Sequence, residues 1–220
     1  PFNPRSSSHR NDDYCEGTAW QWTWFVPHDV DGLVALMGGR EDFIGKLDSL
    51  FTADSKLEGE STSVDISGLI GQYAHGNEPS HHIAHLYNYV GQPWRTQEIV
   101  DEVLHTLYFN NPDGLSGNED CGQMSAWYIF SSMGFYPVDP ISGEYVLGAP
   151  QMDKISIQLT EDRAFVVEAK NLSRKNKYVK SVELNGKPVR GLTIKHEDIM
   201  SGGHLAVSYT HLTLPTNSRV

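Results

Sequence analysis

The chain has 220 residues, a formal net charge of −11, and a composition that is 39% hydrophobic and 20% charged. This composition is typical of one or two globular domains and argues against disorder. The acidic balance argues against nucleic acid or an anionic membrane as a partner, because both need clusters of Lys and Arg. No apolar run approaches the ~20 residues of a membrane span. A neutral or cationic ligand is expected instead.

Cys15 and Cys121 are the only cysteines of the chain, and neither lies in a CxxC or HxxxC pattern. Such spacing identifies zinc ribbons, and small disulfide-rich domains carry more cysteines. The sequence therefore predicts two buried free thiols, with a single disulfide between them as the alternative.

The two ends of the chain carry signals of their own. The amino end has no initiating Met and no signal peptide, which indicates an interior piece of a longer reading frame. Residues 207–216 reverse-translate to a DNA sequence that resembles a transposon-end adapter of sequencing libraries. We therefore expect residues 207–220 to be a non-native tail outside the fold.

From Val30 to about Phe135 the sequence shows the periodicity of helices. Apolar residues at i, i+3, i+4 and i+7 predict a helix over Val30–Met37, and a second apolar stripe predicts one over Phe43–Phe51. Prolines fit the first turn of two further helices, which are expected over Pro79–Val90 and from Pro93 to Leu107.

A helix that begins after Gly122 carries apolar side chains on opposite sides and is expected to be buried all round. Amphipathic helices that alternate with a buried one suggest an inner and an outer layer, as in an α/α barrel or a helical array.

From residue 139 to residue 206 the period changes to two. Ile155, Ile157 and Leu159 alternate with polar residues, and Asn185–Gly186 is a strong hairpin signal. The sequence therefore predicts a mainly α fold, with the helical part over residues 1–138 and an antiparallel β segment over residues 139–206.

Three acidic clusters each adjoin aromatic or apolar segments, at residues 14–29, 75–85 and 117–123. Aromatic rings stack on the apolar faces of sugars, and carboxylates and amides bind sugar hydroxyls. The pattern is therefore typical of a sugar site. An aromatic core with surface acids would produce the same composition.

The surroundings of three acids suggest different tasks. Glu16 precedes Trp20, Trp22 and Trp24, and if these rings bury it, its protonated form is favoured, which suits a general acid. Glu78 precedes Pro79 at a helix start, where the helix dipole favours the ionised form.

Asp120 lies just before the helix that begins near Gly122, so it should stay charged and accept a proton from water. The structural alternative for Asp120 is an N-cap, which satisfies the same backbone donors. Asn118, two positions earlier, cannot act as a base.

The sequence offers candidate ligands for two metals, zinc and calcium. His81 and His85 are one helical turn apart, but His82 stands where the zinc-protease pattern HExxH has its Glu. Oxygen donors suit calcium better, although the sequence leaves the ligands open. The candidate donors are Asn77, Glu78, Glu119 and Gln123.

Three long motifs, EGTAWQWTWFVPHDVDGLVALMGG, HGNEPSHHIAHLYNYVGQPW and GNEDCGQMSAWYIFSSMGFYPV, occur in this order along the chain. Together they resemble the carboxyl-terminal part of the glycoside hydrolase family 92 α-mannosidases, from about residue 14 to residue 206. The resemblance implies a calcium-dependent, inverting exo-α-mannosidase, most often acting on α-1,2-linked mannose of high-mannose glycans. It also implies an amino-terminal β-sandwich, missing here, before an (α/α)6 barrel, and export from a bacterium.

The resemblance also assigns roles to residues. Glu16 matches the general acid, with Glu78 as second choice, and Asp120 matches the general base. Asn118 stands where many relatives have Asp. The expected substrate-binding residues are Trp20, Gln21, Asn77, Glu78 and Glu119, and the expected calcium ligands are Asn77, Glu78 and Gln123.

Two other functions compete with this one: a non-catalytic carbohydrate-binding domain of the same fold, and a zinc hydrolase. We expect the isolated chain to be inactive and poorly soluble, because apolar surfaces meant for missing neighbours would be exposed.

Overall fold

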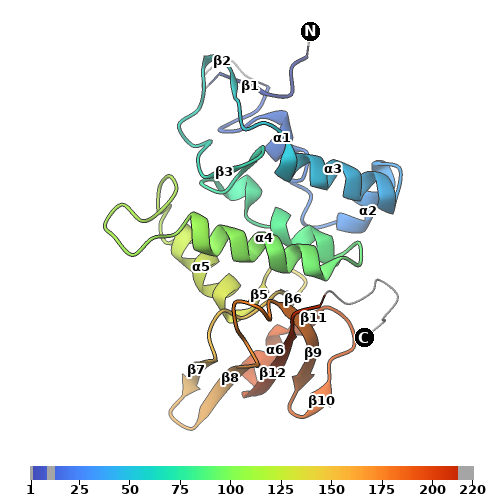
Figure 1. The fold of residues 1–220 in the computed structure, drawn as a ribbon, viewed down its shortest axis with the longest axis vertical. Helices are drawn as coiled ribbons and strands as arrows, with labels where there is room; N and C mark the ends of the chain where they lie inside the picture. Colours follow the sequence, from blue (N-terminus) through green and yellow to red (C-terminus); the bar gives the residue numbers. More distant parts are fainter. Residues whose placement is uncertain (1, 9–12, 213–220) are drawn as a thin grey trace. The chain divides into compact units, whose positions relative to one another are not determined.

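The computed structural model describes residues 2–8 and 13–212, and these residues form two compact units (Figure 1). Unit 1 combines residues 1–84 with residues 105–126, and unit 2 combines residues 85–104 with residues 127–220. The sequence placed a single boundary after residue 138. The division differs because Met133 and Phe135 pack into the core of the sheet, so the chain before residue 138 already belongs to unit 2.

The helices of unit 1 begin with α1 (Ala19–Trp22), α2 (Val30–Leu36) and α3 (Arg40–Thr52). The last two confirm the predicted stripes. Asp29 caps α2 by accepting a hydrogen bond from the Gly32 amide at 2.9 Å, and α3 buries the apolar residues that its period places on one face. On that face Phe43 meets Trp24 edge-on, with ring centroids 5.4 Å apart.

Unit 1 also contains short strands that the sequence did not predict. They are β1 (Ser6–Ser8), parallel to β2 (Glu58–Ser61), and a hairpin of β3 (Leu69–Ile70) with β4 (Tyr73–Ala74). A strand of two residues is too short to show a period of two. The hairpin tip is held to α3, because the Gln72 amide donates to the Leu50 carbonyl at 2.7 Å.

The helix predicted over residues 79–90 is wrong in type. The chain forms two 3₁₀ segments, η1 (Glu78–Ser80) and η2 (Ile83–Asn88). Ser, His, Tyr and Asn are weak helix formers and dominate this stretch, and nearly all of its side chains are buried, so packing decides the backbone. The helix from Pro93 is confirmed as α4 (Pro93–Thr106), which buries its predicted apolar face.

Helix α5 (Gln123–Met133) corrects another expectation. Met124 and Trp127 are fully buried, but Tyr128 is 36% exposed and Ile129 is 55% exposed. The helix therefore buries one side and leaves the side of Ile129 exposed to solvent. That these helices belong to an (α/α)6 barrel stays a prediction.

The main sheet of unit 2 has the strand order β10-β9-β12-β8-β7. Its members are β7 (Lys154–Thr160), β8 (Arg163–Lys170), β9 (Tyr178–Leu184), β10 (Lys187–Pro188) and β12 (Gly203–Thr210). The β7–β8, β9–β10 and β9–β12 pairs are antiparallel as predicted, and Asn185 and Gly186 form the turn of the β9–β10 hairpin with positive φ. The β8–β12 pair is parallel, which corrects the prediction of a purely antiparallel segment.

A smaller sheet and one short helix complete unit 2. The sheet pairs β11 (Thr193–Lys195), β6 (Glu144–Leu147) and β5 (Phe135–Tyr136), and α6 (His196–Met200) follows β11. Phe165, Val167 and Leu205 are central to the apolar core that these elements share.

Strand β12 crosses the predicted end of the fold at residue 206. Val207 and Tyr209 are buried and continue the alternation that Leu205 begins. The Tyr209 hydroxyl donates to the Pro150 carbonyl at 2.5 Å, and burial raises the pKa of Tyr209. Residues 207–210 are thus part of the sheet, while residues 213–220 of the predicted tail lie outside the described part of the chain.

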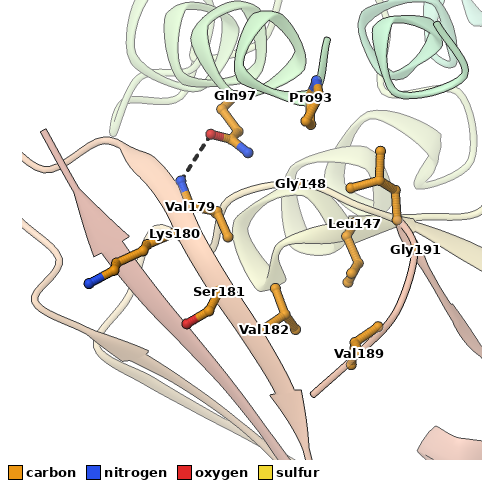
Figure 2. A pocket seen from close by; sticks show the side chains of 11 residues that line it. Pro93, Gln97, Leu147, Gly148, Val179, Lys180, Ser181, Val182, Val189 and Gly191 are labelled. Carbon is orange, nitrogen blue, oxygen red and sulfur yellow. Dashed lines mark hydrogen bonds between the residues drawn. The ribbon is translucent and has the colours of Figure 1, made fainter. Parts of the chain in front are cut away.

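Unit 2 has a small cavity between α4 and β9, shown in Figure 2. Its volume is about 70 Å³, and Pro93, Leu147, Val179 and Val182 are among its lining residues. At the edge of the cavity, the Gln97 side-chain oxygen accepts a hydrogen bond of 3.0 Å from the Val179 backbone amide. Ligand pockets usually enclose roughly 300 Å³ or more, so this cavity is too small for a sugar.

Neither cysteine is buried, which corrects the sequence prediction, but both are free thiols as predicted. Within residues 2–8 and 13–212, no helix has the length and apolar character that crossing a membrane requires.

Candidate active site

The loop that carries Glu16 is fixed at its backbone by two hydrogen bonds. The Trp22 indole donates to the Cys15 carbonyl at 2.8 Å, and the Asn77 amide nitrogen donates to the Glu16 carbonyl at 3.0 Å. A Cβ added at Gly17 would lie 2.8 Å from the Trp22 ring nitrogen, so the loop lies directly on that ring. Asn77 thus ties the first predicted motif to the second.

A positive φ marks both candidate catalytic residues. The described non-glycine residues with positive φ are Glu16, Asp120, Cys121, Asn171 and Asn185. Asn and Asp adopt this conformation readily, whereas Glu and Cys rarely do. Strain of this kind costs about 1–3 kcal/mol and clusters at functional sites, so Glu16 and Cys121, the residue after Asp120, stand out from ordinary turns.

The third motif packs against the second through their glycines. A Cβ at Gly117 would lie 3.0 Å from the Gly76 carbonyl oxygen, and one at Gly76 would lie 2.9 Å from the Ser116 carbonyl oxygen. The loop of residues 76–78 therefore contacts both the Glu16 loop and the loop that leads to Asp120. Unit 1 thus brings the initial residues of the second motif into contact with the first motif and with the initial residues of the third.

A chain of hydrogen bonds fixes the ring of His75, the residue directly before the loop of residues 76–78. The Tyr108 hydroxyl donates to the Met124 carbonyl at 3.1 Å, so it accepts from His75 Nε2 at 2.7 Å. His75 Nδ1 must then accept from the Tyr73 hydroxyl at 2.8 Å. Burial, and next the nearby His81, lower the pKa of His75 well below its usual 6.5, which keeps the ring in this neutral form.

His81 orients a predicted calcium ligand. Its Nε2 donates to the His75 carbonyl at 3.0 Å, so its Nδ1 accepts from the Gln123 side-chain nitrogen at 3.1 Å. Burial is the largest cause that lowers the pKa of His81 to about 4, and Asp120 is a smaller opposing influence. Both ring nitrogens of His81 bind protein groups, so His81 is not available as a zinc ligand. The hypothesis of a zinc site at His81 and His85 therefore loses its basis.

Two residues predicted to bind substrate make hydrogen bonds that stabilise helix ends. The Gln21 side-chain oxygen accepts from the Thr18 amide at 2.6 Å and hydroxyl at 2.7 Å, and its nitrogen donates to the Gln72 carbonyl at 2.5 Å. Gln21 is therefore part of the capping box of α1. Glu119 accepts from the Ser125 amide and hydroxyl, both at 3.0 Å, and so caps α5.

The tryptophans after Glu16 do not bury it. Trp24 is fully buried against Phe43, the Trp20 ring lies 4.1 Å from the Lys46 ammonium, and the Glu16 side chain is exposed. The prediction that indoles surround this carboxyl is wrong, because the Trp24 ring packs into the core of unit 1 and the Trp22 ring lies against the backbone of the Glu16 loop. Lys46 also covers one face of Trp20 that was expected to meet substrate.

The other predicted site residues are placed as follows. Asp120 and Asn118 are exposed, Asn77 is buried, and Glu78 is half-buried. Glu78 begins a 3₁₀ turn of three residues, so the expected helix dipole is small there. The sequence missed the supporting residues His75 and Tyr108. The sequence suggests the histidines of the second motif only as candidate metal ligands, although a buried histidine is more often held by hydrogen bonds to protein groups.

The orientation of two amides fits a hard cation. Asn77 and Gln123 both use the side-chain nitrogen to bind a protein acceptor, so the oxygen of each is the atom left for a ligand. Amide and carboxylate oxygens are the donors that calcium prefers, and Glu78 follows Asn77 directly. The described residues contain no group of three or more His, Cys, Asp or Glu side chains that could hold a metal, so a cation here depends on the amides.

Comparison with known proteins agrees with this assembly of motifs. A family model described as the glycosyl hydrolase family 92 catalytic domain matches residues 1–211. The chain therefore belongs to glycoside hydrolase family 92, which confirms the resemblance seen in its motifs.

Solved structures of this family have the same fold. A family 92 α-mannosidase from Bacteroides thetaiotaomicron, solved in complex with mannoimidazole, is 40% identical with a TM-score of 0.88, over 96% of this chain and 28% of that one. An inverting mannosidase of the family from Bacteroides thetaiotaomicron VPI-5482 is 37% identical with a TM-score of 0.78, over 96% of this chain and 31% of that one.

A curated relative from Arthroderma benhamiae, described as an uncharacterized secreted glycosidase, is 30% identical over 196 residues. The alignment covers 88% of this chain and 23% of that protein. The chain thus spans about a quarter of the length of the relatives that it matches.

The burial of His82 predicts a pH-dependent stability. Burial lowers the pKa of His82 from 6.5, although its Nε2 donates to the Trp24 carbonyl at 2.7 Å. Below pH 6.5 the unfolded chain binds a proton at His82 that the folded chain rejects, so the free energy of unfolding falls on acidification. The free energy of unfolding should change by at most about 1.4 kcal/mol per pH unit for this one proton. The change should continue from pH 6.5 down to the lowered pKa of His82 in the folded chain.

This effect is measured by urea unfolding followed through tryptophan fluorescence at pH 7 and pH 5.5. His82→Gln should reduce the pH dependence of the free energy of unfolding by an amount equal to the uptake of up to one proton. The control is His28→Gln, which changes an exposed histidine. Equal slopes for the parent chain and His82→Gln would contradict the prediction.

Proposed function

We propose that this chain contributes the acid–base centre of a calcium-dependent, inverting exo-α-mannosidase that acts on α-1,2-linked mannose of high-mannose glycans. One observation carries the proposal: Glu16, whose backbone is strained, and Asp120 lie on two loops that are both in contact with residues 76–78. The mannosidase names of its solved relatives support the substrate class.

The reaction is a single displacement. Glu16 donates a proton to the glycosidic oxygen as the bond from that oxygen to C1 breaks. A water oxygen bonds to C1 from the opposite face, and Asp120 accepts the proton that this water loses. Inversion requires the two carboxyls to lie roughly 6.5–9.5 Å apart, which leaves room for the water.

Calcium would be held by the side-chain oxygens of Asn77 and Gln123 and by the carboxylate of Glu78. Bound there, it would supply positive charge that orients the vicinal hydroxyls of mannose. Asn77 also fixes the Glu16 backbone, so the same residue would couple the binding of the sugar to the position of the acid.

The wider architecture belongs to the same proposal. Residues 1–138 would form part of an (α/α)6 barrel, whose other helices would cover the exposed Ile129 side of α5, and a β-sandwich would precede it. The relatives' greater length supports this arrangement. Export from the cell is supported by the secreted relative from Arthroderma benhamiae.

The anomer of the released sugar tests the mechanism. Proton NMR of the complete enzyme acting on an α-1,2-linked mannobiose should show β-mannose first, with α-mannose appearing only by mutarotation. Initial release of α-mannose would exclude the single displacement, because retention needs two successive inversions at C1.

A further inference from the structure

Three backbone segments of unit 1 meet beside the candidate site. The Gly76 amide donates to the Ser67 carbonyl at 3.0 Å, and the His75 amide donates to the Gly68 carbonyl at 3.1 Å. These bonds extend the β3–β4 hairpin by two residues on each side. The third segment, residues 116–117, lies against the extension and leads to Asp120.

The Ser67 hydroxyl fills the space between the two glycines. A Cβ at Gly76 would lie 2.0 Å from Ser67 Oγ, and a Cβ at Gly117 would lie 2.8 Å from the same atom. Real Cβ atoms essentially never come within 3.0 Å of another heavy atom. Neither position therefore accepts a side chain while Ser67 keeps its hydroxyl in place.

Hydrogen bonding does not explain this hydroxyl. Ser67 Oγ is buried and has no hydrogen-bond partner among the described residues, and a buried donor without a partner is unfavourable. Its position explains it better, because the atom separates the loop of residues 76–78 from the loop of residues 117–120. The cost of the unpaired group is consistent with a functional constraint on the spacing.

We propose that Ser67 is a positioning residue that sets the distance between the sugar-binding loop and the loop of the general base. Gly76 directly precedes Asn77 and Glu78, and Gly117 is three residues before Asp120, so a shift at the contact moves both loops. The inference rests on the proposed function. Misplacing a reacting group by ~1 Å can cost up to ~100-fold in rate.

A double-mutant cycle in the complete enzyme tests the proposal. Gly76→Ala forces the loops apart and should lower kcat by at least ~10-fold, with a smaller change in KM. Ser67→Ala alone should lower kcat less, because it only opens a gap. Combined with Gly76→Ala, it should recover much of the lost kcat, since it removes the atom that the new methyl group strikes.

Recovery should be partial, because the Ser116 carbonyl oxygen would still lie 2.9 Å from the new Cβ and Ser67 Cβ 3.2 Å from it. Gly45→Ala is the matched control, because a Cβ there has no neighbour within 4 Å. Its activity should be independent of Ser67. Full activity of Gly76→Ala, or no recovery in the double variant, would overturn the proposal.

Stability separates positioning from a purely structural role. The midpoint of thermal unfolding is measured for the four proteins of the cycle, which are the unsubstituted enzyme, Gly76→Ala, Ser67→Ala and the double variant. The kcat of each is measured well below the lowest of these midpoints. Loss of kcat in Gly76→Ala protein that remains folded supports positioning, whereas lowered midpoints with unchanged kcat refute it. If Gly76→Ala does not fold, Ser67→Ala decides alone, and unchanged kcat refutes the proposal. An unsubstituted enzyme that releases no mannose contradicts the proposed function, and the cycle in unfolding midpoints then still tests the contact.

Discussion

Asp120→Asn in the complete enzyme is expected to lower kcat by at least ~100-fold and to leave KM nearly unchanged. Asn has the size of Asp and adopts positive φ as readily, so the backbone conformation should be kept and only the proton acceptor lost. Glu16→Gln should cause a similar loss, because the amide has no acidic proton to give. Steady-state kinetics on an α-1,2-mannobiose, together with calorimetry of sugar binding, measure both effects.

The matched controls are Asp162→Asn and Glu161→Gln, which change exposed carboxyls of the β7–β8 turn in unit 2. They should retain full activity. Retained turnover in Asp120→Asn would exclude this residue as the base. An unsubstituted enzyme that binds mannose without cleaving it would instead favour the non-catalytic carbohydrate-binding domain.

Exhaustive chelation is expected to lower kcat/KM by more than ~10-fold, because positive charge near the reacting sugar contributes several kcal/mol to catalysis. Calcium should restore the rate and zinc should not, since amide and carboxylate oxygens suit a hard cation. Calorimetry with calcium alone gives a second readout, in which Glu78→Gln should bind more weakly and Glu161→Gln normally. Full activity after exhaustive chelation would refute the calcium proposal.

The elements that the sequence predicted well are those with long apolar stripes. Helices α3 and α4 have their predicted faces because a period of 3.6 over a dozen residues leaves little ambiguity. The 3₁₀ segments at residues 78–88 could not be predicted from the pattern, since a buried stretch shows no amphipathic period and packing overrides propensity.

The structure connects the loops of the three predicted motifs, while the catalytic and binding roles of Glu16, Asn77 and Asp120 stay predictions. The sequence could not reveal that Gln21 and Glu119 cap helices, because the same oxygen atoms bind a backbone amide or a sugar hydroxyl equally well. Nor could it indicate the direction of the tryptophan rings, which depends on α3 and its neighbours.

The place of β12 in the sheet has a consequence for biosynthesis. This strand is the last of the described strands in sequence, yet it lies at the centre of the main sheet and joins the β7–β8 hairpin to the β9–β10 hairpin. Pairings over such sequence separations form slowly. While the ribosome is still making residues 203–210, the two hairpins have unpaired inner edges, and such edges invite aggregation. Rapid translation of this short stretch, or a chaperone that covers the edges, would therefore favour correct folding of unit 2.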